Sequence, residues 1–234
     1  VSVPLWSSVL RKKDMKVKYI SQAWLVILLS LSFGGALAGV DVWLAPLIEA
    51  NMLAATIDKI STLVPGANNT VSARYDPVPV TVGEGKFKTT YKAFWATDDK
   101  GKPLGWVIKT SGAGFADKIE LLIGVDSQVG TITGLRVLSQ KETPGLGNKI
   151  EEVGSADKPA FLMQFEKGIK ADKPVGAIKD TPVPGSNKIK AVTGATISSA
   201  AICTIVNEAL TPQLRSALVK ALNDGPKLRQ KAKE

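Results

Sequence analysis

The hydrophobic positions of the chain change their spacing twice. Residues 23–40 form an apolar run without a charge, and with residues 20–22 it reaches about 20 residues, the length a helix needs to cross a bilayer. From residue 46 apolar side chains recur at helical spacing until Pro65 and Gly66. From Thr90 onward, short apolar segments alternate with polar turns, which is typical of strands. The pattern predicts a membrane helix, a second helix and a β-rich body.

The strand-like region predicts an antiparallel sheet whose neighbouring strands are largely connected by hairpins. Polar turns at residues 98–101 and 126–130 separate the apolar segments in pairs. The four expected strands cover residues 91–96, 104–109, 119–125 and 131–139. The polar stretch 66–88 before them is expected to be a loop with a short edge strand.

Helical segments are expected mainly after the sheet. Residues 159–165 are a short helical candidate, residues 189–192 a short strand, and residues 198–222 the longest helical stretch of the body. Pro212 either breaks that stretch or begins a second helix. The expected fold class is therefore α+β, with a single N-terminal transmembrane helix followed by one domain that has an antiparallel sheet and flanking helices.

The same pattern divides the chain into five parts, and no internal repeat is evident. We expect a basic N-terminus, a transmembrane anchor, a linker helix with a loop, one folded domain and a basic tail. Their boundaries are residues 1–22, 23–44, 45–88, 89–222 and 223–234.

Charge next to the apolar run predicts its orientation. Residues 1–22 carry five basic side chains and one acidic one, whereas the first charge after the run is Asp41. The positive-inside rule places the N-terminus in the cytoplasm and the body on the extracytoplasmic side of the cell membrane. A cleaved signal peptide is the alternative, since Ala36 and Ala38 fit a small-x-small cleavage pattern. We expect the segment to be retained as a single-pass anchor.

Composition excludes several classes of site. The net charge is +9, but residues 1–22 contribute +4 and residues 220–234 contribute +3, so the 197 residues between them are nearly neutral. A nucleic-acid interface needs basic residues clustered on the folded body, so none is expected. The chain has no histidine and only Cys203 as cysteine, which excludes imidazole metal ligands, a thiolate zinc site, an iron–sulfur cluster and a His-dependent nucleophile, and we expect no metal site. Any redox work needs an organic cofactor.

Two short motifs are candidates for binding. In the first, TGATISS at residues 193–199, a strand turns through Gly194 into a helix N-terminus rich in hydroxyl groups. Such an N-terminus offers free N–H groups and a positive dipole end to an anion, although a simple helix cap would have the same sequence. The second, KETPGLG at residues 141–147, is either an ordinary turn or a loop whose glycines allow a planar ring to approach.

Together the motifs are recognisable. ETPGLG followed about 50 residues later by TGATISS resembles the FMN-binding domain of ion-pumping respiratory complexes, found in the G subunit of the Rnf complex and in the C subunit of the sodium-pumping NADH:quinone reductase. Gly114, Phe115 and Asp117 resemble the Rnf protein, because a Gly-Leu-Trp-Ser-type stretch would be expected here in the other one. The resemblance covers residues 91–209, and it implies that the domain at residues 89–222 binds FMN.

The resemblance implies a cofactor and its site. FMN would be attached through its phosphate to Thr196, the last residue of the T-G-A-T motif, by a dedicated flavin transferase that uses FAD as donor. The implied phosphate-side residues are Thr193, Gly194, Ala195, Thr196 and Ser199, and the implied ring-side residues are Glu142, Thr143, Leu146 and Gly147. Neither a catalytic residue nor an independent substrate site is evident. In the family an acidic residue usually stands where this chain has Lys190. A transferase that needs this carboxylate would label the chain slowly or not at all, whereas Lys190 could instead neutralise the phosphate.

The implied function is electron transfer within a membrane complex. The chain would be the flavin-carrying member of an ion-translocating ferredoxin:NAD oxidoreductase (Rnf) complex, with the other subunits as partners. Its single apolar helix carries no ionisable residue within residues 23–40, so the ion path would belong to those partners. Three alternatives remain: the C subunit of a sodium-pumping NADH:quinone reductase, a non-redox exported module that binds a phosphate-bearing ligand or stabilises neighbouring subunits, and a stand-alone exported flavoprotein reductase.

Overall fold

The computed structural model describes the backbone of residues 6–73, 76–83, 88–152 and 159–231, and the side chains between residues 23 and 222 within these ranges. The chain divides into two compact units at residues 53 and 54. The basic residues predicted at 1–22 and 223–234 therefore lie outside the described side chains.

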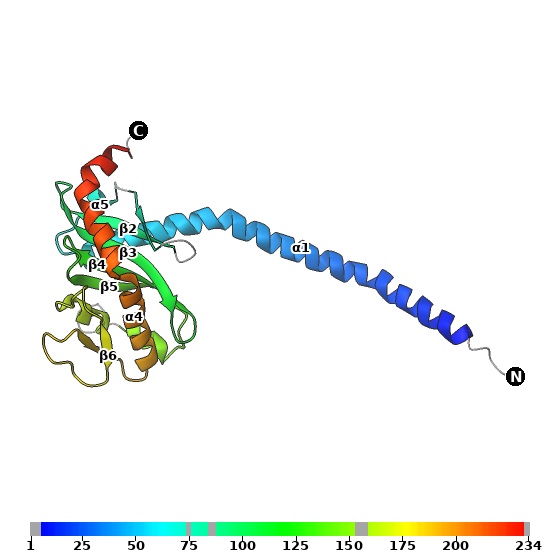
Figure 1. Cartoon of the computed structure of the whole chain (residues 1–234). Coiled ribbons are helices and arrows are strands. Elements are labelled where there is room, and N and C mark those ends of the chain that lie inside the picture. Colours follow the sequence, from blue (N-terminus) through cyan, green and yellow to red (C-terminus); the bar gives the residue numbers. More distant parts are fainter. Residues whose placement is uncertain (1–5, 74–75, 84–87, 153–158, 232–234) are drawn as a thin grey trace. The chain divides into compact units, whose positions relative to one another are not determined.

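The N-terminal unit consists of most of one long helix, α1 (Trp6–Asp58). The predicted anchor and the first part of the predicted linker helix are one element (Figure 1). Pro46 lies inside this helix instead of beginning one. A proline inside a helix removes one backbone hydrogen bond, which a long apolar helix tolerates. Within the part of the chain that the structure describes, only the segment Ala23–Asp58 is long and apolar enough to cross a membrane.

The body contains the predicted antiparallel sheet. Its strand order is β1-β2-β3-β4-β5, so each strand pairs with the next one in sequence. The bounds are β1 (Val78–Val82), β2 (Thr89–Thr97), β3 (Pro103–Ala113), β4 (Lys118–Asp126) and β5 (Ile132–Ser139). All four predicted strands are confirmed, and β1 is the expected edge strand. The β3–β4 hairpin extends further than predicted, to a tip at residues 114–117.

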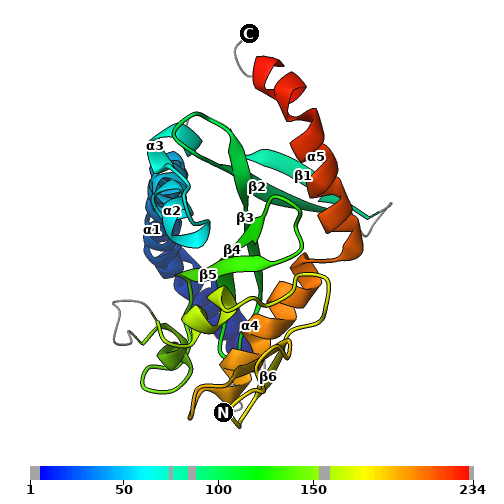
Figure 2. The same ribbon diagram turned by 90° about the vertical axis from the view of Figure 1, so that its left-hand side faces the viewer.

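Helices cover both faces of the sheet (Figure 2). Because side chains alternate along a strand, Ala93 and Trp95 face one core, whereas Phe94 and Ala96 face another. The first core is closed by α4 (Thr196–Ala209) and α5 (Pro212–Lys231), and the second by α2 (Ile60–Leu63). The short helix α3 (Asn69–Ser72) packs beside β2. Pro212 begins the second helix of the predicted pair.

Short elements connect β5 to α4. They are the 3-10 helices η2 (Gly147–Glu151) and η3 (Leu162–Glu166) and a parallel pair, β6 (Gly176–Ile178) and β7 (Lys188–Lys190). The predicted helix at 159–165 is a 3-10 helix displaced by a few residues, and the predicted strand at 189–192 ends two residues earlier. β6 has no clear sequence signal, because it is only three residues long. β7 leads directly into the TGATISS motif.

Candidate functional site

The TGATISS motif forms the predicted turn from a strand into a helix. β7 ends at Lys190, and α4 begins at Thr196. Gly194 has a φ of +84°, a left-handed conformation that side chains other than glycine rarely adopt. The N–H of Ala195 donates to the carbonyl of Val192 at 2.9 Å and closes the turn. The motif is thereby bent so that Thr196 becomes the first residue of α4.

The N-terminus of α4 is open to an anion. Ala195 occupies the capping position and contributes no side-chain hydrogen bond. Thr193, Gly194 and Thr196 are exposed. Since the first N–H groups of a helix have no partner within the helix, an uncapped N-terminus presents them together with the positive end of the helix dipole. The sequence-predicted phosphate side therefore has three accessible members.

The other two predicted phosphate-side residues are buried and hold the turn together. The hydroxyl of Ser199 donates to the carbonyl of Ala195 at 2.8 Å and accepts from the N–H of Val192 at 3.1 Å. Ser199 is fully buried, and Ala195 is 3% exposed. Ser199 thus links the end of the strand segment to the first turn of α4, and its contribution to binding is to fix the position of its neighbours.

The ETPGLG loop is fastened by Glu142, whose side chain is 5% exposed. Oε1 of Glu142 accepts hydrogen bonds from the N–H groups of Phe115 at 2.9 Å and Ala116 at 3.1 Å. Oε2 accepts from the hydroxyl of Ser198 at 2.5 Å. One carboxylate therefore joins the loop after β5, the tip of the β3–β4 hairpin and the first turn of α4.

These hydrogen bonds determine the protonation of Glu142. Burial raises the pKa of this carboxyl group, but hydrogen bonds from Ser198, Ala116, Phe115 and Asp117 lower it, and the net pKa lies below its usual value. The group is an anion at neutral pH and can only accept hydrogen bonds. This requires donors on the two other segments, the hairpin tip and the first turn of α4.

The loop packs tightly around the carboxylate. A Cβ atom at Gly147 would overlap the side chains of Glu142 and Ser198, and one at Gly114 would overlap Glu142. Thr143 and Leu146 point outward, and Leu146 is 52% exposed. The structure thus brings both motifs together, with Glu142 and Gly147 buried beneath the loop and Thr143 and Leu146 on its surface.

An apolar surface surrounds this junction, and two of its members were not among the predicted site residues. Among the described side chains from residue 54 onward, the strongly exposed large hydrophobics are Phe115, Leu146, Val183 and Ile197. Phe115 and Ile197 are each 61% exposed. Phe115 donates its N–H to Glu142, and Ile197 precedes Ser198, so both lie on segments fastened to Glu142. We call Phe115, Leu146 and Ile197 the apolar rim.

The one cysteine is unsuited to redox work. Cys203 lies buried on α4, and burial raises the pKa of its thiol to about 12. The thiol is therefore protonated at neutral pH and is a poor nucleophile. The chain's own side chains offer no redox group in this region.

The carboxylate of Glu142 predicts a pH-dependent stability. Because its pKa is lower in the folded than in the unfolded chain, ionised Glu142 stabilises the fold above the unfolded-state pKa, and this contribution is lost as the pH falls through the folded-state pKa. Glu142→Gln should unfold at lower urea concentration than the wild type at pH 7, by a difference that shrinks between about pH 5 and pH 3. Urea titrations of the detergent-solubilised chain measure it, with exposed Asp172→Asn as control. An equal difference at pH 7 and pH 3 would contradict the role of the charge.

Comparisons with known proteins agree with this architecture. A family model described as an FMN-binding domain matches residues 114–211. The fold resembles the C subunit of the Na(+)-translocating NADH-quinone reductase of Parabacteroides distasonis, with a TM-score of 0.50 and 25% identity over 75% of this chain and 96% of that one. NqrC of Shewanella oneidensis is similar, with a TM-score of 0.51 and 20% identity over 65% of this chain and 73% of that one.

Curated relatives are more similar in sequence. The G subunit of the Na(+)-translocating ferredoxin:NAD(+) oxidoreductase complex of Acetobacterium woodii is 36% identical over 46% of this chain, which spans only about half (48%) of that relative. The G subunit of the proton-translocating complex of Clostridium ljungdahlii is 35% identical over 62% of this chain and 74% of that relative. The G subunit of an ion-translocating oxidoreductase complex from Methanosarcina acetivorans is 31% identical over 59% of this chain and 67% of that relative. The chain therefore belongs to the G-subunit family of Rnf-type ion-translocating oxidoreductase complexes.

Proposed function

We propose that this chain is the electron-transfer subunit of an ion-translocating ferredoxin:NAD oxidoreductase complex and carries FMN bonded through its phosphate to Thr196. The observation that carries the proposal is the exposed Thr196 at the uncapped start of α4, within the T-G-A-T sequence. The matching FMN-binding family model and the G-subunit relatives support it.

The residues around Thr196 fit a phosphodiester. An ester to the hydroxyl of Thr196 would retain one negative charge on the phosphate. That charge would lie at the N-terminus of α4, where the N–H groups and the helix dipole favour an anion. Exposed Thr193 adds a hydroxyl donor, and Gly194 leaves the approach free of a side chain. Each accessible phosphate-side residue thus has a part in holding the group.

The apolar rim fits an isoalloxazine ring. Leu146, Phe115 and Ile197 expose apolar surface on the three segments that Glu142 joins, and exposed Thr143 adds a polar group beside Leu146. A planar ring against the rim would remove this surface from water. Glu142, Gly147 and Ser199 act from below, as positioning residues that hold the exposed groups in place.

Bound FMN would carry out the electron transfer, and the chain would bind and orient it. Glu142 is engaged by donors of the chain itself, and the sequence has no histidine, so no proton-transferring side chain is assigned to the site. A covalent ester would suit the extracytoplasmic side, because a flavin lost there would not be replaced. The proposed partners are a flavin transferase during maturation and the other subunits afterwards.

The proposed location follows from α1. Its apolar segment would anchor the chain in the cell membrane, with the basic N-terminus in the cytoplasm and the flavin domain outside. Ion movement would belong to multi-span partner subunits, because the apolar run at residues 23–40 has no ionisable group. Lys190 is exposed where related motifs carry an acid, and we expect Thr196 to be labelled despite it.

The flavin bond can be tested on the denatured chain. Intact-mass analysis of the wild type should show one added FMN, and the gel band should fluoresce under ultraviolet light. Thr196→Ala should lack both signals, because the ester would have no hydroxyl to form on, whereas Thr193→Ala should keep the mass. A wild-type chain with neither fluorescence nor added mass would exclude covalent attachment.

The orientation can be tested with reporter fusions. A reporter that is active only outside the cytoplasm, fused after Leu222, should be active, because the basic residues before the apolar run hold the N-terminus inside. A reporter active only in the cytoplasm should be silent at the same position. The opposite pair of results would place the flavin domain in the cytoplasm.

The ring position can be tested at Leu146. A carboxylate at this exposed position would have to be desolvated against the ring or would push it into solvent. Leu146→Asp should increase quenching of flavin fluorescence by iodide severalfold, or shift the flavin's spectrum or potential, while Thr196 still becomes labelled. Val183→Asp, at an equally apolar exposed position outside the rim, is the control. A labelled Leu146→Asp chain with unchanged spectrum, potential and quenching would show that the loop is only a turn.

A further inference from the structure

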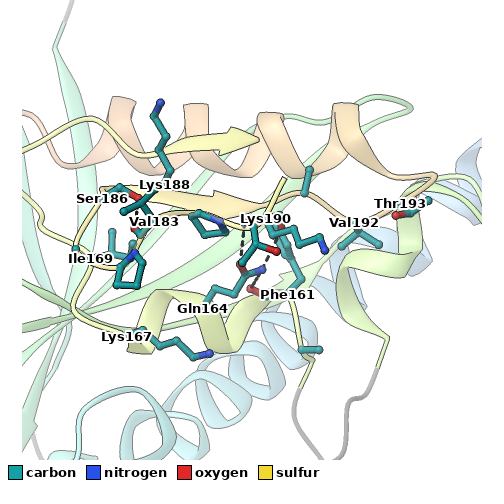
Figure 3. A pocket seen from close by; sticks show the side chains of 16 residues that line it. Phe161, Gln164, Lys167, Ile169, Val183, Ser186, Lys188, Lys190, Val192 and Thr193 are labelled. Atoms are coloured by element: carbon teal, nitrogen blue, oxygen red, sulfur yellow. Dashed lines mark hydrogen bonds between the residues drawn. The ribbon is translucent and has the colours of Figure 1, made fainter. Parts of the chain in front are cut away.

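A half-open cavity of about 680 Å³ lies between η3, the loop at residues 181–186 and β7 (Figure 3). Its volume falls within the range of about 300–1,000 Å³ that is usual for small-molecule pockets. The lining reaches Thr193 but includes neither Thr196 nor any member of the apolar rim. The cavity is therefore next to the proposed flavin site and shares only Thr193 with it.

The cavity is strongly positive. Lys167, Lys188 and Lys190 line it, and no aspartate or glutamate is among its lining residues in the described part of the chain. Lys188 and Lys190 lie on the same face of β7, because Ile189 between them is buried on the other. Figure 3 shows Lys167 on the opposite wall, at the end of η3.

Nearby acids do not neutralise these lysines. Within the part of the chain that the structure describes, none of the three ammonium groups has a carboxylate within 4.0 Å. Glu166, the nearest acid in sequence to Lys167, pairs with Arg136 at 3.3 Å. Asp180 adjoins the 181–186 loop but does not line the cavity. The cavity thus offers three charges to a negatively charged ligand.

Much of the remaining lining is apolar. Phe161, Ile169 and Val192 contribute to the walls, together with the two prolines of the 181–186 loop. Val183 also lines the cavity and is 74% exposed, so it accounts for the fourth exposed large hydrophobic residue of the body. Phe161 and Ile169 are each only 4% exposed, so a ligand would remove apolar surface from water mainly at Val183, Pro184 and Val192.

Hydrogen bonds between side chains and the backbone hold the walls in place. The side-chain amide of Gln164 accepts from the N–H of Lys190 at 2.7 Å and donates to its carbonyl at 3.0 Å, which fixes β7 against η3. The hydroxyl of Ser186 donates to the carbonyl of Val183 at 2.6 Å within the opposite loop. Because the cavity is already formed, a ligand would not have to order it.

We propose that this cavity binds a second ligand, an organic phosphate of mononucleotide size, with its phosphate at Lys167 and Lys190 and its flat or apolar body against Val183, Pro184 and Val192. A phosphate monoester carries nearly two negative charges at neutral pH, whereas a carboxylate carries one. The lysine ammonium groups of the cavity therefore favour a phosphate ligand over a carboxylate ligand. The apolar walls favour an attached base or other apolar group over free phosphate. The site does not depend on the proposed flavin bond.

The test is calorimetric titration of the detergent-solubilised full chain with AMP, UMP and free FMN, each also in excess salt. At least one should bind with a dissociation constant below about 1 mM, and adenosine and inorganic phosphate should bind at least about tenfold more weakly. Lys167→Ala and Lys190→Ala should each weaken binding by about tenfold, the effect expected for a lost charged hydrogen bond. Lys190→Ala keeps the backbone bonds to Gln164. Lys100→Ala, on an exposed turn, should change nothing.

Each other result would overturn the proposal. Binding by none of the three mononucleotides, or unchanged binding to both lysine variants, would exclude the site. Equal binding of inorganic phosphate would reduce it to a plain anion site, and tighter binding of a hexaglutamate peptide would make it a peptide surface. Repeating the titration on flavin-labelled chain and on Thr196→Ala gives a further control. Binding confined to Thr196→Ala would mean that the attached flavin itself fills the cavity.

Discussion

A buried carboxylate needs donors, and in this chain they come from segments far apart in sequence. Glu142 is 5% exposed and accepts from Phe115, Ala116 and Ser198. An unpartnered charge in such a position would cost several kcal/mol, so the three segments are strongly favoured to meet. The hairpin tip, the loop after β5 and the start of α4 are therefore held as one unit, although the sheet alone would leave their positions less constrained.

This constraint separates the residues that hold the site from those that are available to a cofactor. Hydrogen bonds within the chain engage the polar side-chain groups of Glu142, Ser198 and Ser199. Thr196 and Leu146 remain exposed on the same junction. The short sequence motifs thus contain both kinds of residue side by side, and a motif match alone does not tell them apart.

The sequence pattern predicted those elements that depend on interactions between residues close together in the chain. The alternation of apolar segments and polar turns indicated the four strands β2 to β5, and Gly194 before a run of hydroxyls indicated the start of α4. The extension of β3 beyond residue 109 was not predicted, because Thr110 and Ser111 are polar and become strand only through pairing with β4. Nor was the link between Ser198 and Glu142, which are 56 residues apart. Burial of Glu142 and exposure of Phe115 depend on the same long-range contacts.

The position of Lys190 at the end of β7 explains how its charge can act on a bound anion. The side chain of Lys190 lines the cavity, whose lining also reaches Thr193 at the turn before α4. An anion bound in the cavity would therefore lie in the field of a positive charge at this position. Replacing an acid by Lys190 changes the local charge by two units in the direction that favours a phosphate. Lysine at this position, where the family resemblance implies an acid, therefore favours the anionic ligand proposed for the cavity.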